Sequence, residues 1–87
     1  MAIFQKTFTI SNIPAGQYYE NADLDVSVSG YTAMGVVGYN YTHSQVFCFG
    51  IRVYVGTDKM YLGLRTINSA AIEGGFTVYA QILYFKK

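Results

Sequence analysis

The candidates for covalent chemistry in this 87-residue chain are few, because His43 and Cys48 are each the only residue of their kind. A Cys–His dyad needs the thiol and the imidazole within hydrogen-bond reach and a third group that orients the ring. Cys48, however, stands between Phe47 and Phe49 in an alternating pattern, which is typical of a small buried apolar side chain. Ser44 lies beside His43, but adjacency in sequence does not make a catalytic triad. We therefore predict no catalytic residue and no enzyme.

Metal ligands are equally sparse. One His and one Cys cannot form a structural zinc site without further ligands, and a single Cys excludes an intrachain disulfide. Acidic side chains gather at Glu20, Asp23 and Asp25, where Asn21 adds an amide oxygen. Calcium takes about six or more oxygens, often from one loop, so the cluster is either a calcium loop or a solvated loop before a strand. We favour the solvated loop and predict no metal and no cofactor.

Tyrosine is the most prominent candidate for binding, and several of its residues are candidates for partial exposure: Tyr18, Tyr19, Tyr31, Tyr39, Tyr41, Tyr54 and Tyr61. A tyrosine ring stacks on the apolar C–H face of a sugar while nearby polar groups bond its hydroxyls, and tyrosine also suits protein interfaces. For any single tyrosine we favour the alternative, a residue at the edge of the core or at a subunit interface whose hydroxyl reaches water. Because loop tips carry function, the predicted ligand-binding site is the tip that contains Tyr39, Asn40, Tyr41 and His43.

The elements that would position these residues are strands. Helical periodicity is nearly absent, whereas β-branched and aromatic runs recur between Gly, Asn, Asp, Ser and Pro residues. These runs predict six strands, at about 3–10, 24–29, 33–42, 46–55, 60–66 and 76–86. Residues 17–23 and 67–75 are expected to be loops, and Gly35 and Gly38 indicate a bulge or a close backbone approach in the third run. Short connections favour an antiparallel sandwich or barrel, and we predict a single all-β domain over 1–87, a small jelly-roll-like sandwich.

Alternation within the runs predicts which side chains face the core. In the second run the inward residues are Leu24, Val26 and Val28. The fourth run is expected to be the best core strand, with one apolar face made of Phe47, Phe49, Ile51, Val53 and Val55. The last run is apolar on both faces, with Tyr79, Leu83 and Phe85 opposite the inward set.

A strand that is apolar on both faces needs a cover beyond the core of one sandwich. The chain as a whole is also poor in charge, at 13% charged and 52% hydrophobic residues, against about 25% charged in an average soluble domain. We favour a homo-oligomer, with Tyr79, Leu83 and Phe85 at its interface. The alternative is a barrel-like last strand overlaid by the 11–23 loop.

Charge and hydropathy exclude two classes of partner. The net charge is +1 and the basic residues are scattered, apart from the terminal Lys86–Lys87 pair, so the basic stripe of a nucleic-acid-binding protein is missing. No apolar run approaches the ~20 residues of a membrane span, and no signal peptide is expected. We therefore predict no nucleic-acid partner, no membrane insertion and synthesis in a cytoplasm.

Three segments resemble a known family. The run Gly30-Tyr31-Thr32-Ala33-Met34-Gly35-Val36-Val37-Gly38-Tyr39 is similar to a segment that enters a sheet in small C-terminal tip domains of tailed-bacteriophage fibre and receptor-binding proteins. The segments Tyr61–Ser69 and Phe76–Lys86 resemble the closing pair of strands in those domains, which end in an apolar run, a Tyr and a terminal Lys. The resemblance covers roughly residues 24–87.

The resemblance implies a homotrimeric β-sandwich at the distal end of a fibre, in contact with host-surface glycans or proteins. The expected function is thus a virion structural module for adhesion, located in the virion. One departure is that the chain starts at its own Met and lacks a fibrous shaft or repeats. It is therefore either an excised module or a short independent virion protein, and the second case suits a capsid-decoration, head-fibre or fibre-assembly role without receptor contact.

Overall fold

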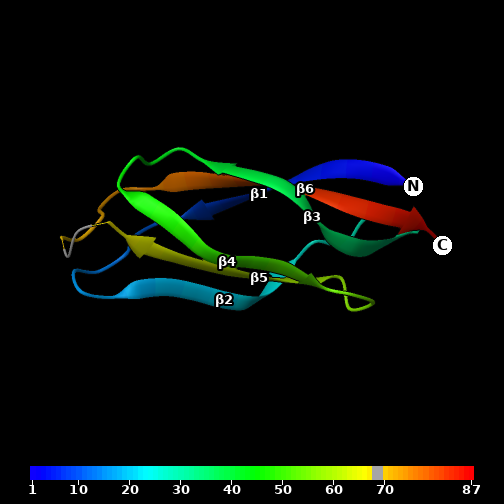
Figure 1. The fold of residues 1–87 in the computed structure, drawn as a ribbon, viewed down its shortest axis with the longest axis horizontal. Helices are drawn as coiled ribbons and strands as arrows, with labels where there is room; N and C mark the ends of the chain where they lie inside the picture. Colours follow the sequence, from blue (N-terminus) through cyan, green and yellow to red (C-terminus); the bar gives the residue numbers. More distant parts are fainter. Residues whose placement is uncertain (68–69) are drawn as a thin grey trace.

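The protein is a two-layer antiparallel β-sandwich (Figure 1), seen in a computed structural model that describes residues 1–67 and 70–87. Its six strands are β1 (Ala2–Ile10), β2 (Tyr18–Asp25), β3 (Tyr31–Tyr41), β4 (Val46–Tyr54), β5 (Lys59–Thr66) and β6 (Phe76–Lys86). One sheet has the order β1-β6-β3 and the other β2-β5-β4. The predicted all-β sandwich of six strands is confirmed. None of the described residues belongs to a helix long and apolar enough to cross a membrane.

The chain passes from one sheet to the other at nearly every connection. The exception among the strands is β4–β5, which pair directly through the turn at residues 55–58. In this turn the Thr57 amide donates to the Tyr54 carbonyl, and Asp58 takes the left-handed conformation with φ 56°. The sandwich is elongated, 44 × 19 × 17 Å, and both termini lie at the same end of it (Figure 1).

The core lies between β5 and β6, the central strands of the two sheets. A central strand has neighbours on both edges and a sheet across its inner face, so its inward side chains are the most completely covered. In β6 the inward set is fully buried, as predicted: Phe76, Val78, Ala80, Ile82 and Tyr84. Met60, Leu62 and Leu64 face them from β5 and are also buried.

The prediction for residues 17–29 was wrong in its boundaries. The expected loop at 17–23 is mostly strand, because Tyr18 to Asn21 pair with the edge of β5, and a bulge before Leu24 leads to the last pairs at Leu24 and Asp25. The polar side chains of this segment gave no strand pattern in the sequence, and its pairing partner β5 lies far away along the chain. Val26 and Val28 keep the predicted inward direction, but they lie beyond the ladder.

The fourth run was predicted as the best core strand, and its Phe47 and Phe49 were assigned to the wrong face. Both rings are exposed, whereas Val46 and Val53 of the same strand are buried. A bulge between Cys48 and Gly50 shifts the register against β5, and an extra residue in a strand reverses which side chains point inward. The predicted inward direction of Val53 is confirmed, whereas that of Val55 is wrong, because Val55 is 61% exposed.

Several smaller expectations can also be compared with the structure. Bulges occur in β3 at Gly35 and near Gly38, as predicted. The expected loop at 67–75 includes residues 68 and 69, which lie outside the described part of the chain. Its residue Ile72 forms a bridge with Ile13. The alternative in which residues 11–23 overlay the last strand is wrong, because residues 18–25 belong to the opposite sheet.

Candidate functional site

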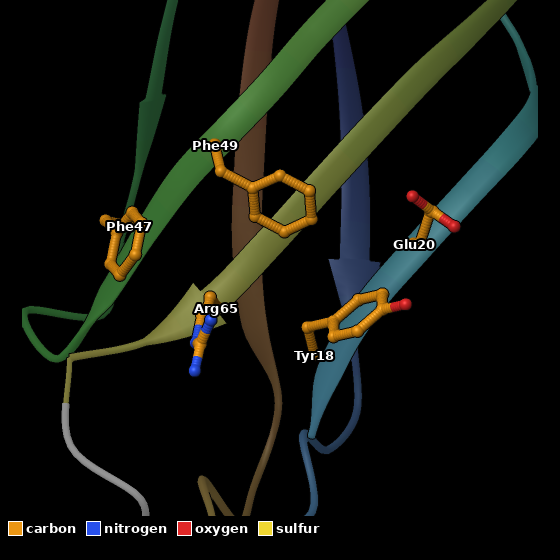
Figure 2. Close-up of a pocket in the computed structure, with 5 residues that line it drawn as sticks. All are labelled: Tyr18, Glu20, Phe47, Phe49 and Arg65. Carbon is orange, nitrogen blue, oxygen red and sulfur yellow. The ribbon is translucent and has the colours of Figure 1, made fainter. Parts of the chain in front are cut away.

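A recess on the outer face of the β2-β5-β4 sheet is a candidate site (Figure 2). Its lining comes from all three strands and consists of Tyr18, Glu20, Phe47, Phe49 and Arg65. The cavity volume is about 360 Å³, which falls at the small end of the range for ligand pockets, about 300–1,000 Å³. The recess therefore combines three aromatic rings, one carboxylate and one guanidinium.

The register of the three strands brings these side chains together. Arg65 of β5 pairs with Tyr18 of β2 on one side and with Phe47 of β4 on the other. The next outward position along β5 is Gly63, which pairs with Glu20 and with Gly50. Outward side chains two residues apart share a face, so the five lining residues form two adjacent rows.

Gly63 is buried beneath two side chains of this face. A Cβ placed on it would lie 2.6 Å from the Phe49 ring and 2.6 Å from the Tyr61 hydroxyl oxygen. Gly50 likewise lies beneath Tyr61, whose ring carbon Cε2 would lie 2.8 Å from a Cβ at that position. Two side chains thus lie flat on glycine backbone, which is a common reason for glycine inside a strand.

The aromatic side chains of the recess are unusually open to solvent. Tyr18 is 58% exposed, Phe49 46% and Phe47 40%. Tyr18 and Phe49 contact each other edge to face, with ring centroids 5.8 Å apart and planes at 87°. Figure 2 shows the Phe49 ring lying across β5 and Arg65 lying between Phe47 and Tyr18. Exposed aromatic rings that already hold each other in place provide contact area at a low entropic cost.

Polar groups frame the recess on opposite sides. The Tyr61 hydroxyl donates to Glu20 Oε2 at 2.6 Å, and this hydrogen bond to the carboxylate raises the pKa of Tyr61 to about 12. The Arg65 guanidinium makes no hydrogen bond or ion pair with any described residue. A second arginine of the same sheet, Arg52, instead lies over the rings of Tyr54 and Tyr61, at 5.4 and 5.2 Å from their centroids. Arg65 is therefore the guanidinium of this face that remains available.

The predicted tip site is only partly assembled. Tyr39 and Tyr41 lie together with their rings stacked, 6.4 Å between centroids. Asn40 lies between them in the strand and therefore on the opposite face of the sheet, and its Oδ1 accepts a hydrogen bond from the Tyr41 amide. His43 Nδ1 accepts from the Gln45 amide at 3.1 Å, and its ring edge contacts Phe76.

The residues weighed for catalysis lie in ordinary structural roles. The Cys48 thiol donates to the Gly50 carbonyl, and burial raises the pKa of this thiol. The ring of His43 is engaged with Phe76. No catalytic geometry links the two among the contacts of the described residues.

The acidic cluster is dispersed by the strand that holds it. Glu20 bonds Tyr61, Asn21 Oδ1 accepts from the Asp23 amide, and Asp25 Oδ1 accepts from the Ser27 amide. This bond from the Ser27 amide holds the pKa of Asp25 below its usual range. Within residues 1–67 and 70–87, His, Cys, Asp and Glu nowhere form a group of three that could hold a metal ion.

The residues predicted for an oligomer interface share the outer face of the other sheet. Tyr79, Leu83 and Phe85 alternate with the buried set of β6, and Phe85 is 47% exposed. Leu83 pairs with the exposed Ile3 on one side and with Gly35 on the other. Apolar side chains of β1 and β6 thus share this face with the hydrogen-bonded pair of Gln81 and Gln5.

Sequence reasoning missed the recess because it placed Phe47 and Phe49 in the core and Tyr18 in a loop. A usable signal was present in Gly50 and Gly63, which interrupt the two adjacent runs with no turn in either place. Comparison of the chain with protein-family models, curated proteins and solved structures finds no match.

Proposed function

We propose that this protein is a non-enzymatic binding module of the bacteriophage fibre-tip kind, which contacts a host-surface glycan or protein as part of the virion. The single observation that carries the proposal is the recess, in which Tyr18, Phe47 and Phe49 are exposed together. Clustered exposed apolar surface on a small soluble domain marks an interaction site. Aromatic residues and arginine are also the residue types that contribute most to interfaces.

The position of the recess along the molecule supports an adhesive role. It is built where β2 and β4 begin and β5 ends, around the pairs of Arg65. That end of the sandwich lies opposite the chain termini (Figure 1). A connection made through either terminus would therefore leave the recess free to meet a partner. The predicted tip of Tyr39, Asn40, Tyr41 and His43 lies at the same end, where β3 of the other sheet leads into the connection to β4.

Self-association through the other sheet is part of the proposal, with a trimer favoured. On this face Ile3 is 59% and Phe85 47% exposed, and Leu83 lies half-buried beside Ile3. Homo-oligomer interfaces are apolar in this way. Use of this face for assembly leaves the recess on the opposite outer face available.

A second candidate is a purely structural virion component, such as a capsid-decoration or fibre-assembly protein. The exposed apolar side chains Ile3 and Phe85 on the same face favour it, because apolar surface suits a permanent contact with another virion protein. This candidate predicts binding to virion proteins and none to cells.

The test is binding of fluorescently labelled protein to a panel of bacterial strains, measured by flow cytometry. On a strain that binds, Phe49→Ser is expected to weaken binding by about tenfold or more, because central aromatic anchors dominate interface energies. Val55→Ser is the matched control, since Val55 is an apolar side chain that is 61% exposed outside the recess.

The outcomes separate the two surfaces and the two functions. If Tyr39→Ser loses binding and Phe49→Ser keeps it, the binding site is the predicted tip and not the recess. Absence of binding to every strain, together with capture of a virion protein, would favour the structural role.

A further inference from the structure

We propose that the recess lined by Tyr18, Glu20, Phe47, Phe49 and Arg65 binds one ring of a neutral saccharide. The proposal rests on the proposed function and adds the chemical class of the partner. It is argued from three features: the aromatic walls, the opposite charges on either side and the position over a central strand.

The aromatic walls suit a flat ring with apolar faces. Tyr18 and Phe49 meet at 87°, so a ligand that rests on the face of one ring also meets the edge of the other. The axial C–H groups of a pyranose form such a flat apolar face. The volume of about 360 Å³ admits one or a few sugar rings, since pockets for drug-sized ligands start at about 300 Å³.

The polar frame suits hydroxyl groups. Arg65 offers five N–H donors in a fixed fork and no acceptor, and all are unused by the described residues. Glu20 offers acceptors only: its Oε2 is held by the Tyr61 hydroxyl, which leaves Oε1 for a ligand. A sugar hydroxyl both donates and accepts, so adjacent hydroxyls satisfy both groups.

The charges favour a neutral saccharide over a charged one. Glu20 and Arg65 contribute one negative and one positive charge to the same lining, which sum to zero. A carboxylate or ammonium on the ligand would gain one attraction and meet one like charge.

The place of the recess in the sheet argues against an extended peptide. Peptides that add to sheets bond an unpaired strand edge. Gly63 and Arg65 belong to β5, which is paired on both sides with β2 and β4. A peptide therefore cannot add to the backbone of β5, and recognition over this strand uses side chains.

The experiment is a glycan array of neutral oligosaccharides and their uronic-acid and amino-sugar counterparts, followed by NMR titration of ¹⁵N-labelled protein with each binder. We expect neutral members to bind, with amide shifts at Tyr18, Glu20, Phe49 and Arg65. Removal of a charged hydrogen-bonding group costs about tenfold or more in affinity, so Arg65→Ala and Glu20→Gln should each weaken binding by that factor. Arg52→Ala is the matched control, because it removes a guanidinium from the same face outside the recess.

Each other outcome overturns the proposal. Preference for uronic acids or amino sugars would overturn the neutral class, and an equal effect of Arg52→Ala would overturn the recess as the site. If no glycan binds while Phe49→Ser still abolishes cell binding, the saccharide is refuted and the adhesion proposal stands with a protein partner. If Phe49→Ser leaves cell binding intact, the adhesive role of the recess itself fails. Unchanged thermal unfolding of the variants shows that each result concerns binding and not folding.

Discussion

Replacement of Tyr84 by Phe tests how the two sheets are joined. Tyr84 lies in the central strand β6 and is fully buried. Its hydroxyl donates to the Val26 carbonyl at 2.5 Å, in the segment that leaves the opposite sheet. Burial also raises the pKa of Tyr84, as expected for a phenol that stays protonated.

The magnitude follows from what the substitution leaves behind. Tyr84→Phe keeps the ring contacts with Phe4 and Tyr31 but removes the donor to a buried carbonyl. An unsatisfied buried acceptor costs about 1–3 kcal/mol. For a domain of this size each kcal/mol lowers the melting temperature by about 4–8 °C, so a fall of about 4–24 °C is expected in thermal unfolding followed by circular dichroism.

Tyr31→Phe is the matched control. Tyr31 belongs to the same ring cluster, but its hydroxyl has no partner among the described residues. Its removal is expected to change the free energy of unfolding by less than about 0.5 kcal/mol. Equal melting temperatures for Tyr84→Phe and the wild type, or an equal loss in both variants, would refute the reasoning.

Three further predictions concern the two outer faces and the acid limit. Gly63→Ala should displace the Phe49 ring, which would lie 2.6 Å from the new Cβ, and so weaken partner binding. The melting temperature should stay within about 8 °C of the wild type, because the exposed Phe49 ring is free to move outward. Unchanged binding would contradict this. Leu83→Glu should reduce the mass in solution, measured by light scattering, to that of a monomer, whereas Phe47→Glu should not; a wild-type monomer would exclude the oligomer. The pKa of Asp25 is lower in the folded than in the unfolded protein. The ionised Asp25 carboxylate therefore stabilises the fold above about pH 4, and this stabilisation is lost as the pH falls through the folded-state pKa. Asp25→Asn should therefore flatten the decline in urea midpoints at acid pH, and an unchanged decline would count against the Ser27 hydrogen bond as its source.

The layered fold was predictable because its strongest signals are local. The β6 run is long and apolar on both faces, and the side chains that were predicted to face inward are buried. Its strand length and that of β3 also followed from the pattern within a few residues. The glycines at positions 35 and 38 correctly indicated bulges, since a residue without a side chain tolerates local kinks.

The recess was not predictable by the same reasoning. Alternation assumes an unbroken register, and the bulge between Cys48 and Gly50 breaks it, so both phenylalanines of β4 exchanged faces. β2 was missed because its pairing depends on the open edge of β5, a partner far away in sequence. Both errors concern how a strand pairs with β5, which the pattern of apolar residues within one run does not show.

The most direct measurement for the central claim is a footprint of the partner on the protein. Amide shift perturbations of ¹⁵N-labelled protein would be recorded with surface polysaccharide or surface protein from a strain that the protein binds. We predict that the perturbed residues gather at Tyr18, Glu20, Phe47, Phe49 and Arg65. Perturbations confined to residues 39–43, or to the outer face of the β1-β6-β3 sheet, would contradict the recess as the binding surface.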